Sequence, residues 1–265
     1  MVTFPNAKIN LGLNILSKRT DGYHDISSVF YPIPFEDILE IIPSETFNFE
    51  ITGLTVPGNK DQNLILNAYQ LLRKGHDLPP VTIHLHKIIP MGAGLGGGSS
   101  DAAFTIKMLN TIFNLSLSNE QMEQYAGQLG SDCPFFIRNK PLLAEGTGNI
   151  FKNTVVDLKG KYLVLVCPDI HVGTADAYSK ITPGIPDIPV DEIMEKVQLA
   201  QWKDHLYNDF ERSVLPQFPK IRDIKDQLYA SGALYASMTG SGAAVYGIFE
   251  KKPDAMAMGG KIFKL

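Results

Sequence analysis

Apolar and polar residues alternate along the first stretch of the chain. Between residues 7 and 15 the apolar positions recur at period two, with polar side chains between them. This spacing is typical of a β-strand, because successive side chains of a strand point to opposite faces. The sequence therefore predicts a half-buried strand that carries Lys8 and Asn10 on its polar face.

The same two kinds of periodicity predict further elements in the first half of the chain. Alternation predicts strands at about 24–33, 36–42 and 46–52, and another that starts at 81 and runs into Pro90. Apolar residues at helical spacing predict helices at 63–74 and 101–114, the second capped by Ser99 or Ser100. Ser118 and Gln121 fit the capping box of a third helix that ends near residue 130.

The character of the sequence changes near residues 150–160, where lysine, asparagine and glycine surround a short apolar stretch. This change predicts two domains, residues 1–155 and 156–265. In the second we expect a strongly apolar strand at 161–167 and a strand, glycine turn and strand at 235–249. The helices expected there lie at about 174–181, 190–200, 209–215 and 219–231. Strands and helices on this scale predict an α+β protein.

Bulk composition fits an ordinary globular enzyme, with 265 residues of which 44% are hydrophobic and 20% charged. Cys133 and Cys167 lie far apart, so we expect neither a disulfide framework nor a zinc site, and a reducing cytoplasm fits better. His84 and His86 share a strand face, but no further histidine or cysteine completes a metal site.

Partners other than small molecules are not expected from the sequence. No apolar run approaches the ~18–20 residues that span a bilayer, and the first residues lack the pattern of a signal peptide. The net charge is −4, without a lysine or arginine cluster, which disfavours nucleic-acid binding.

The segment from Pro90 to Asp101 carries the strongest chemical signal. Its sequence, PMGAGLGGGSSD, has five glycines within residues 92–98. Glycines let the backbone adopt positive φ and approach a ligand closely, and the N–H groups at the start of a helix attract an anion. Ser99 and Ser100 add hydroxyls for phosphate oxygens. The loop is therefore predicted to hold the phosphates of ATP.

Two other glycine-rich motifs fit less well. A Walker A loop needs a lysine after its last glycine, and none follows here. The dinucleotide fingerprint matches Gly92, Gly94 and Gly97, but it also needs an acidic residue at the end of a second strand about 20 residues on. Glu120 and Glu123 fall inside a predicted helix instead. A plain surface turn would carry more solvating side chains, so the phosphate-binding interpretation is favoured.

In this context the loop resembles the ATP-binding motif of the GHMP kinases. Three signatures match that superfamily in order along nearly the whole chain: PNAKINL at 5–11 with RTDGYH at 19–24, the glycine loop, and MTGSGAAV at 238–245. Within the superfamily, the first signature resembles the kinases of a cytidine-diphosphate-linked methylerythritol. The resemblance implies a two-domain α+β GHMP kinase fold with an N-terminal ATP-binding domain, a ferredoxin-like C-terminal domain and an active site between them.

The resemblance also implies a catalytic pair, Lys8 and Asp132. Asp132 lies in LGSDCPF, which matches the family pattern L-G-x-D-x-P-F. A carboxylate near the attacking hydroxyl can accept its proton, and an ammonium group can stabilise the charge of the transferring phosphoryl group. Without the resemblance, Asp132 reads as the N-cap of a helix before Pro134 and Lys8 as a solvated strand residue.

Substrate and nucleotide residues follow from the same resemblance. Tyr23 and His24 match positions that stack on and hydrogen-bond the cytosine ring, and Tyr178 matches a second aromatic that sandwiches it. The other implied substrate residues are Asn10, Thr174, Gly240, Ser241 and Gly242. The residues implied for ATP, which enters with Mg²⁺, are Asn63, Leu64, Ile65, Lys87, Pro90, Met91, Gly92, Ala93, Gly94, Leu95, Gly96, Gly97, Gly98, Ser99 and Ser100.

Several of these residues have a plainer structural interpretation. Lys87 would solubilise a strand end, Tyr23 would be an exposed turn aromatic, and residues 240–242 would form an ordinary hairpin turn. Two positions depart from the family. Ala93 stands where members often have glycine, and Asp101 where others have asparagine. A carboxylate near the phosphates opposes ATP binding unless Mg²⁺ or the helix dipole offsets it.

Three other functions stay open as alternatives. The chain could be a kinase of the same superfamily that acts on homoserine, mevalonate or a sugar, but Tyr23 and His24 argue against substrates that lack a base. It could be a non-catalytic nucleotide sensor, which the intact Lys8 and Asp132 disfavour. The third alternative is a dinucleotide-dependent oxidoreductase. A monomer and a homodimer are both compatible with the sequence.

Overall fold

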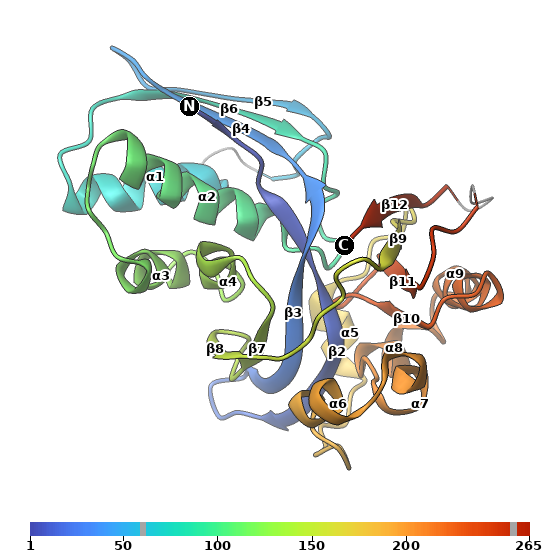
Figure 1. Cartoon of the computed structure of the whole chain (residues 1–265). Coiled ribbons are helices and arrows are strands. Elements are labelled where there is room, and N and C mark those ends of the chain that lie inside the picture. The colour runs from blue at the N-terminus through green and yellow to red at the C-terminus, as the bar shows by residue number, and fades with distance from the viewer. Residues whose placement is uncertain (59–61, 255–258) are drawn as a thin grey trace. The chain divides into compact units, whose positions relative to one another are not determined.

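The computed structural model describes residues 1–58, 62–254 and 259–265. The chain forms two compact units (Figure 1). The first unit consists of Met1–Ala7, Phe35–Met91 and Gly96–Lys140. The second consists of Lys8–Pro34, Gly92–Leu95 and Pro141–Leu265. Each unit thus contains segments from distant parts of the sequence, and the domain boundary at residues 155 and 156 stays a prediction.

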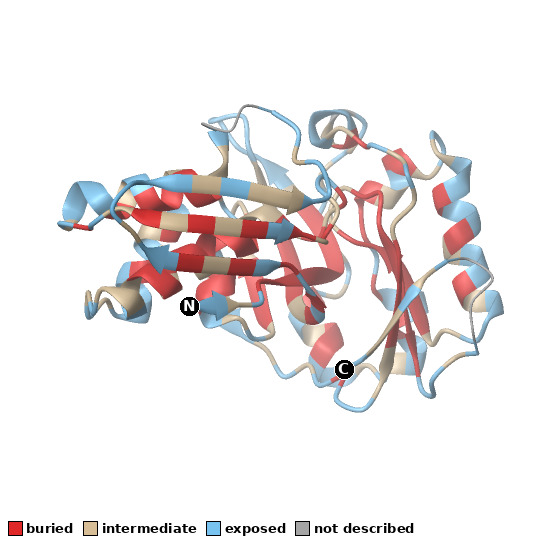
Figure 2. Cartoon of the chain, turned by 90° about the horizontal axis from the view of Figure 1, so that it is seen from above, coloured by how far each residue is buried: buried red, intermediate tan, exposed pale blue. Residues whose placement is uncertain are grey.

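The first unit contains a four-stranded sheet in the order β1-β4-β6-β5. These strands are β1 (Val2–Thr3), β4 (Ile38–Pro43), β5 (Asn48–Gly53) and β6 (Val81–Lys87). β4 pairs antiparallel with β1 and β6, whereas β5 runs parallel to β6. Buried and less buried residues alternate along β6, and Figure 2 shows this banding across the sheet. The alternation predicted for the strand after residue 81 is confirmed.

Helices of the first unit lie on one side of this sheet (Figure 1). They are α1 (Leu64–Gly75), α2 (Gly97–Ile112), α3 (Asn119–Gly127) and α4 (Cys133–Arg138). Asn63 caps α1, because its side chain accepts a hydrogen bond from the backbone N of Ile65. Ser118 and Gln121 form both bonds of a capping box at α3, which confirms that prediction.

The second unit contains two four-stranded sheets. One has the order β2-β3-β7-β8 and the other β10-β11-β9-β12. The strands of the first sheet are β2 (Asn6–Lys18), β3 (His24–Glu36), β7 (Leu142–Glu145) and β8 (Ile150–Asn153). Those of the second are β9 (Tyr162–Val166), β10 (Tyr235–Met238), β11 (Val245–Phe249) and β12 (Lys261–Lys264). β10 and β11 form an antiparallel pair, as the predicted strand, turn and strand require.

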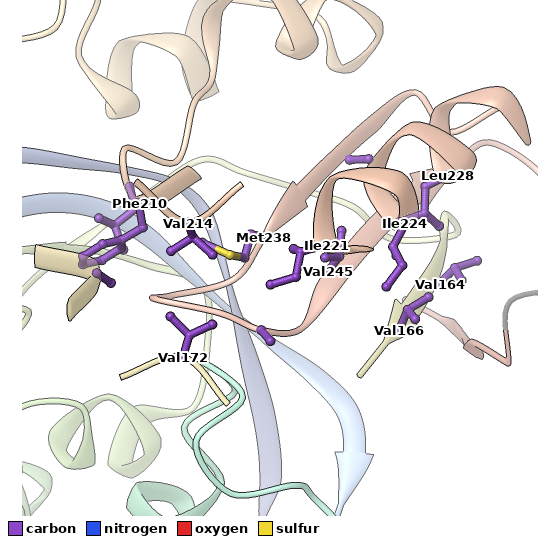
Figure 3. Packing of buried hydrophobic residues seen from close by; sticks show 14 of the residues in the cluster. Val164, Val166, Val172, Phe210, Val214, Ile221, Ile224, Leu228, Met238 and Val245 are labelled. Carbon is purple, nitrogen blue, oxygen red and sulfur yellow. The ribbon is translucent and has the colours of Figure 1, made fainter. Parts of the chain in front are cut away.

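A hydrophobic core in the second unit packs three of its helices, at residues 174–179, 210–214 and 219–230, against its sheets (Figure 3). Ile221, Ile224 and Leu228 project from α9 at helical spacing and join a cluster that includes Val164 and Val245. The helices of this unit are α5 (Thr174–Ser179), α6 (Val190–Lys196), η2 (Leu199–Gln201), α7 (Trp202–His205), α8 (Phe210–Val214) and α9 (Pro219–Ala230). Among the helices that the structure describes, none is long and apolar enough to cross a membrane.

Two predictions about these elements are wrong, and several short elements were not predicted. β2 is buried on both faces from Asn6 to Ile15, so it is not half-buried. α2 begins at Gly97 rather than Asp101, and its N-cap is Gly96 rather than a serine. Short segments at 133–138, 142–145, 150–153 and 261–264 form elements that were not predicted, because four to six residues are too few to establish a period.

Candidate active site

The glycine loop joins β6 to α2, as the sequence predicts. Gly92, Gly94 and Gly96 have φ of 66°, 77° and 69°, in the left-handed region that favours glycine. Gly96 is also the N-cap of α2, and it has no side chain that could bond the first N–H groups of the helix. This 16-residue helix therefore begins with backbone donors that suit an anion such as phosphate.

Gly94 lies against the turn between β10 and β11. A Cβ on Gly94 would stand 2.0 Å from the backbone O of Thr239, and one on Gly240 would stand 3.1 Å from the Cα of Gly94. The neighbouring Leu95 O accepts a hydrogen bond from the backbone N of Lys8 at 2.9 Å. The second unit thus holds residues 92–95 of the loop by backbone contacts that a side chain at Gly94 would prevent.

A pocket of about 210 Å³ lies in the first unit. Its lining residues are Ile51, Val56, Pro57, Gly58, Gln62, Asn63, Leu64, Leu85, Lys87, Met91, Gly98 and Asp101. Mostly apolar walls with a few polar groups suit the flat base of a nucleotide. Five of the residues implied for ATP lie here: Asn63, Leu64, Lys87, Met91 and Gly98. Ile65 is 1% exposed within α1 and lies outside this lining.

Lys87 is buried between two carboxylates of the first unit. Its Nζ donates to Asp37 Oδ2 at 2.5 Å and to Asp101 Oδ2 at 2.7 Å. Asp37 Oδ1 also accepts from the backbone N of Ile88 and of Ile89. Burial of Lys87 rules out the solubilising interpretation. Asp37 was not predicted, because nothing in its sequence neighbourhood distinguishes it from a solvated turn residue.

Asp101 carries the excess charge of this cluster. Burial raises its pKa to about 7, with Lys87 opposing the shift and Asp37 adding to it. Its Oδ1 has no hydrogen-bond partner among the described residues. Lys87 therefore offsets the charge of Asp101. The sequence alone suggests only Mg²⁺ or the helix dipole for this role.

Replacing Asp101 with asparagine is expected to raise the melting temperature more at pH 8 than at pH 5. Because folding raises the Asp101 pKa, the folded protein binds the proton more tightly than the unfolded chain, and stability falls as the pH rises from about 4 to about 7. Asparagine has no such proton, so the variant should lack this fall in stability. Melting temperatures of the wild type and the variant between pH 5 and pH 8 measure the difference, with Asp77→Asn as an exposed control. Identical pH dependence in wild type and Asp101→Asn would contradict the expectation.

Lys8 is buried in β2, with 3% of its surface exposed. Its Nζ donates to Asn10 Oδ1 at 2.7 Å and lies 4.6 Å from the centroid of the Phe30 ring. Asn10 donates through Nδ2 to Ser28 Oγ at 2.9 Å. The interpretation of Lys8 as a solvated residue is therefore wrong. Asn10 orients the ammonium group, and its own contact with a substrate stays a prediction.

Asp132 stands at the N-cap position of α4, two residues before Pro134. Its φ of −81° and ψ of −15° are helical, and its side chain forms no capping hydrogen bond within the described chain. The N-cap interpretation thus holds for the position but not for the side chain. Asp132 belongs to the first unit and Lys8 to the second. Their action as a pair stays a prediction.

Two of the residues implied for the cytosine ring meet in the second unit. His24 stacks on Tyr178, with ring centroids 4.6 Å apart and planes at 14°. Tyr178 meets Phe210 edge to face at 4.7 Å and 84°. Tyr23, which precedes His24 in the sequence, is 66% exposed, as its turn predicts. Phe210 was not predicted, because it looks like an ordinary apolar residue of α8.

Residues 240–242 form the turn of the β10–β11 hairpin, as their plainer interpretation predicts. Ser241 Oγ lies 3.2 Å from Thr174 Oγ1, so two of the residues implied for substrate binding share a hydrogen bond. A contact between this turn and a diphosphate stays a prediction.

No cluster of three or more His, Cys, Asp or Glu side chains that could hold a metal occurs among the described residues. His84 Nε2 and His86 Nδ1 each lie 2.9 Å from Thr52 Oγ1, which gives both rings a hydrogen-bond partner on the sheet.

Comparison with known families identifies both halves of the chain. Residues 63–140 match the GHMP kinases N terminal domain, and residues 190–261 match the GHMP kinases C terminal domain. Curated relatives match over nearly the whole chain. The 4-diphosphocytidyl-2-C-methyl-D-erythritol kinase of Bacteroides fragilis is 54% identical over 97% of this chain and 95% of its own length. That of Cytophaga hutchinsonii is 52% identical over 96% and 94%.

Solved structures agree with these relatives. A crystal structure of 4-(cytidine 5'-diphospho)-2C-methyl-D-erythritol kinase superimposes with a TM-score of 0.80 at 30% identity, over 94% of this chain and 90% of that one. Methanococcus jannaschii mevalonate kinase reaches a TM-score of 0.66 at 17% identity over the same shares, which shows a common fold.

Proposed function

The chain belongs to the GHMP kinases and, within them, to the 4-diphosphocytidyl-2-C-methyl-D-erythritol kinases, and we propose that it transfers the γ-phosphate of ATP to the 2-hydroxyl of 4-diphosphocytidyl-2-C-methyl-D-erythritol. It is an ATP-dependent kinase. The products are the 2-phosphate and ADP, and the reaction belongs to the non-mevalonate route to isoprenoid precursors.

The burial of Lys8 carries this proposal. A lysine that is 3% exposed loses most of its hydration, and proteins rarely bury one unless it is paired or has a function. Its Nζ is aimed by Asn10, and its backbone N bonds to Leu95 of the glycine loop. The strand that carries the ammonium group is therefore attached to the loop predicted to hold the phosphates.

In the proposed reaction, a bond forms between the substrate hydroxyl oxygen and the γ-phosphorus, and the bond from that phosphorus to the bridging oxygen of ADP breaks. Asp132 accepts the hydroxyl proton. Lys8 stabilises the negative charge on the transferring group. The amides at the start of α2 orient phosphate oxygens, and the apolar pocket beside Lys87 takes the adenine.

Mg²⁺ is proposed to enter on the phosphates of ATP. Because the described residues offer no cluster of three or more metal-binding side chains, the protein would contribute few direct ligands. A cytoplasmic location and a monomeric or homodimeric state stay predictions.

Purified protein with Mg·ATP should release ADP when 4-diphosphocytidyl-2-C-methyl-D-erythritol is added, and little when mevalonate or homoserine replaces it. A coupled ADP assay with each alcohol as acceptor distinguishes the superfamily members. Turnover with mevalonate or homoserine in place of the cytidine compound would overturn the substrate assignment. ATP binding without turnover of any acceptor would favour the sensor alternative.

Replacing Tyr178 with alanine should raise KM for the cytidine substrate by about tenfold, because base–aromatic stacking contributes about 1–3 kcal/mol per base. kcat should change far less, since the base lies away from the reacting hydroxyl. Tyr178→Phe is the matched control, because it keeps the ring and should keep KM within about twofold. An alanine variant with wild-type KM would show that the base binds elsewhere.

A further inference from the structure

Thr239 follows β10 directly, and its side chain is fully buried. Its Oγ1 accepts a hydrogen bond from the backbone N of Asn10 at 3.1 Å. The same oxygen lies 3.2 Å from Asn10 Oδ1 and 3.1 Å from the backbone O of Gly94. The hydroxyl thus accepts from the strand that carries Lys8 and shares its one proton between Asn10 Oδ1 and Gly94 O of the glycine loop.

The Asn10 amide lies between Thr239 and Lys8. Its Oδ1 accepts from Lys8 Nζ at 2.7 Å, while its Nδ2 donates to Ser28 Oγ. If the amide turned over, its NH₂ group would face the ammonium group, and two donors would oppose each other. A hydroxyl donor at Oδ1 and a hydroxyl acceptor at Nδ2 both favour the orientation that aims Lys8.

The backbone around Thr239 is fixed from both sides. Thr239 N donates to Ala244 O at 3.0 Å across the hairpin. Asn208, which is 1% exposed, donates through Nδ2 to Met238 O at 2.8 Å and to Gly240 O at 2.9 Å. The hydroxyl therefore projects from a rigid turn rather than from a mobile loop.

We propose that Thr239 is a positioning residue of the kinase reaction, which sets the Asn10 amide and thereby holds the Lys8 ammonium group in register with Gly94 of the glycine loop. The proposal deepens the proposed function and rests on the role assigned there to Lys8. It explains why a buried hydroxyl stands at this turn, where a plain hairpin would need none.

The test compares Thr239→Val, which keeps the shape and removes the hydroxyl, with Thr239→Ser, which keeps the hydroxyl. We expect the valine variant to lose about tenfold in kcat with KM for ATP within about twofold, because misplacing a catalytic group affects the transition state more than binding. Serine should restore most of kcat. Thr105→Val is the matched control, because Thr105 is equally buried but its hydroxyl donates within its own helix, to Asp101 O, and has no other hydrogen-bond partner among the described residues.

A double-mutant cycle with Lys8→Met separates positioning from general stability. If Thr239 acts through Lys8, the valine substitution should cost much less in the Lys8→Met background than in the wild type. Equal losses in both backgrounds, or a valine variant with wild-type kcat, would overturn the proposal. A lower melting temperature with unchanged kcat would show a purely structural residue.

A spectroscopic readout keeps the inference separate from the choice of substrate. In a ¹H–¹⁵N spectrum of the lysine ammonium groups, the Lys8 signal is identified by its absence in Lys8→Met. It should shift or broaden in Thr239→Val and return in Thr239→Ser. An unchanged Lys8 signal would overturn the inference even in an active enzyme. Absence of turnover with the cytidine substrate would overturn the proposed function while leaving this result intact.

Discussion

Replacing Asp132 with asparagine should lower kcat by about a thousandfold, because a positioned general base contributes about 10²–10⁴ to the rate. Asparagine has nearly the same shape but does not take up the hydroxyl proton. ATP binding should be nearly unchanged, since Asp132 is not among the residues of the pocket proposed to take the adenine. The coupled ADP assay gives kcat, and calorimetric titration with ATP gives the dissociation constant.

The structure makes this variant informative because the Asp132 side chain does not cap α4. Its replacement should therefore remove no capping hydrogen bond from the helix, and thermal unfolding of the variant reports its stability separately from kcat. Asp77→Asn, at an exposed position of the same unit, controls for the loss of one surface charge. A loss of less than about tenfold would mean that another group accepts the proton.

Lys8→Met should lower kcat by about 10²–10³, the size of effect seen when one preorganised electrostatic group is removed. Methionine keeps the length of the side chain and can pack on the Phe30 ring, but it provides no charge. Removing the buried ammonium group also removes the cost of its desolvation. Steady-state kinetics measures the loss of catalysis, and thermal unfolding measures any change in stability.

The matched control is Lys18→Met, the same substitution at the exposed end of the same strand. That variant should keep kcat within about twofold, because an exposed surface charge contributes little. A Lys8→Met enzyme with wild-type kcat would remove Lys8 from the mechanism. A variant that fails to fold would instead show that the Lys8–Asn10 bond is needed for the sheet.

The sequence predicts local structure best where interactions between residues close together in the chain determine it. The capping box at Ser118 and Gln121, the alternation of β6 and the strand–loop–helix around the glycine loop all depend on residues within one or two turns of each other. The start of α2 was misplaced because serines are common caps, whereas the left-handed backbone of Gly96 begins the helix earlier.

The sequence by itself also determined the family and the kind of reaction. Its motifs PNAKINL, RTDGYH, PMGAGLGGGSS and MTGSGAAV are each a continuous stretch of sequence. Each can therefore be recognised without knowing which residues lie near it in the fold. These motifs predict that Lys8 belongs to the active site, although its alternation pattern alone suggested a solvated face.

Only the tertiary structure decided the surroundings of these residues. Burial on both faces of β2, the pairing of Lys87 with Asp37 and the contact of Gly94 with Thr239 each join segments far apart in the chain. Periodicity reports which way a side chain points, but the energy of a buried charge or hydroxyl depends on the partner that it meets there. Those partners come from distant segments, so folding brings them together and no local pattern names them.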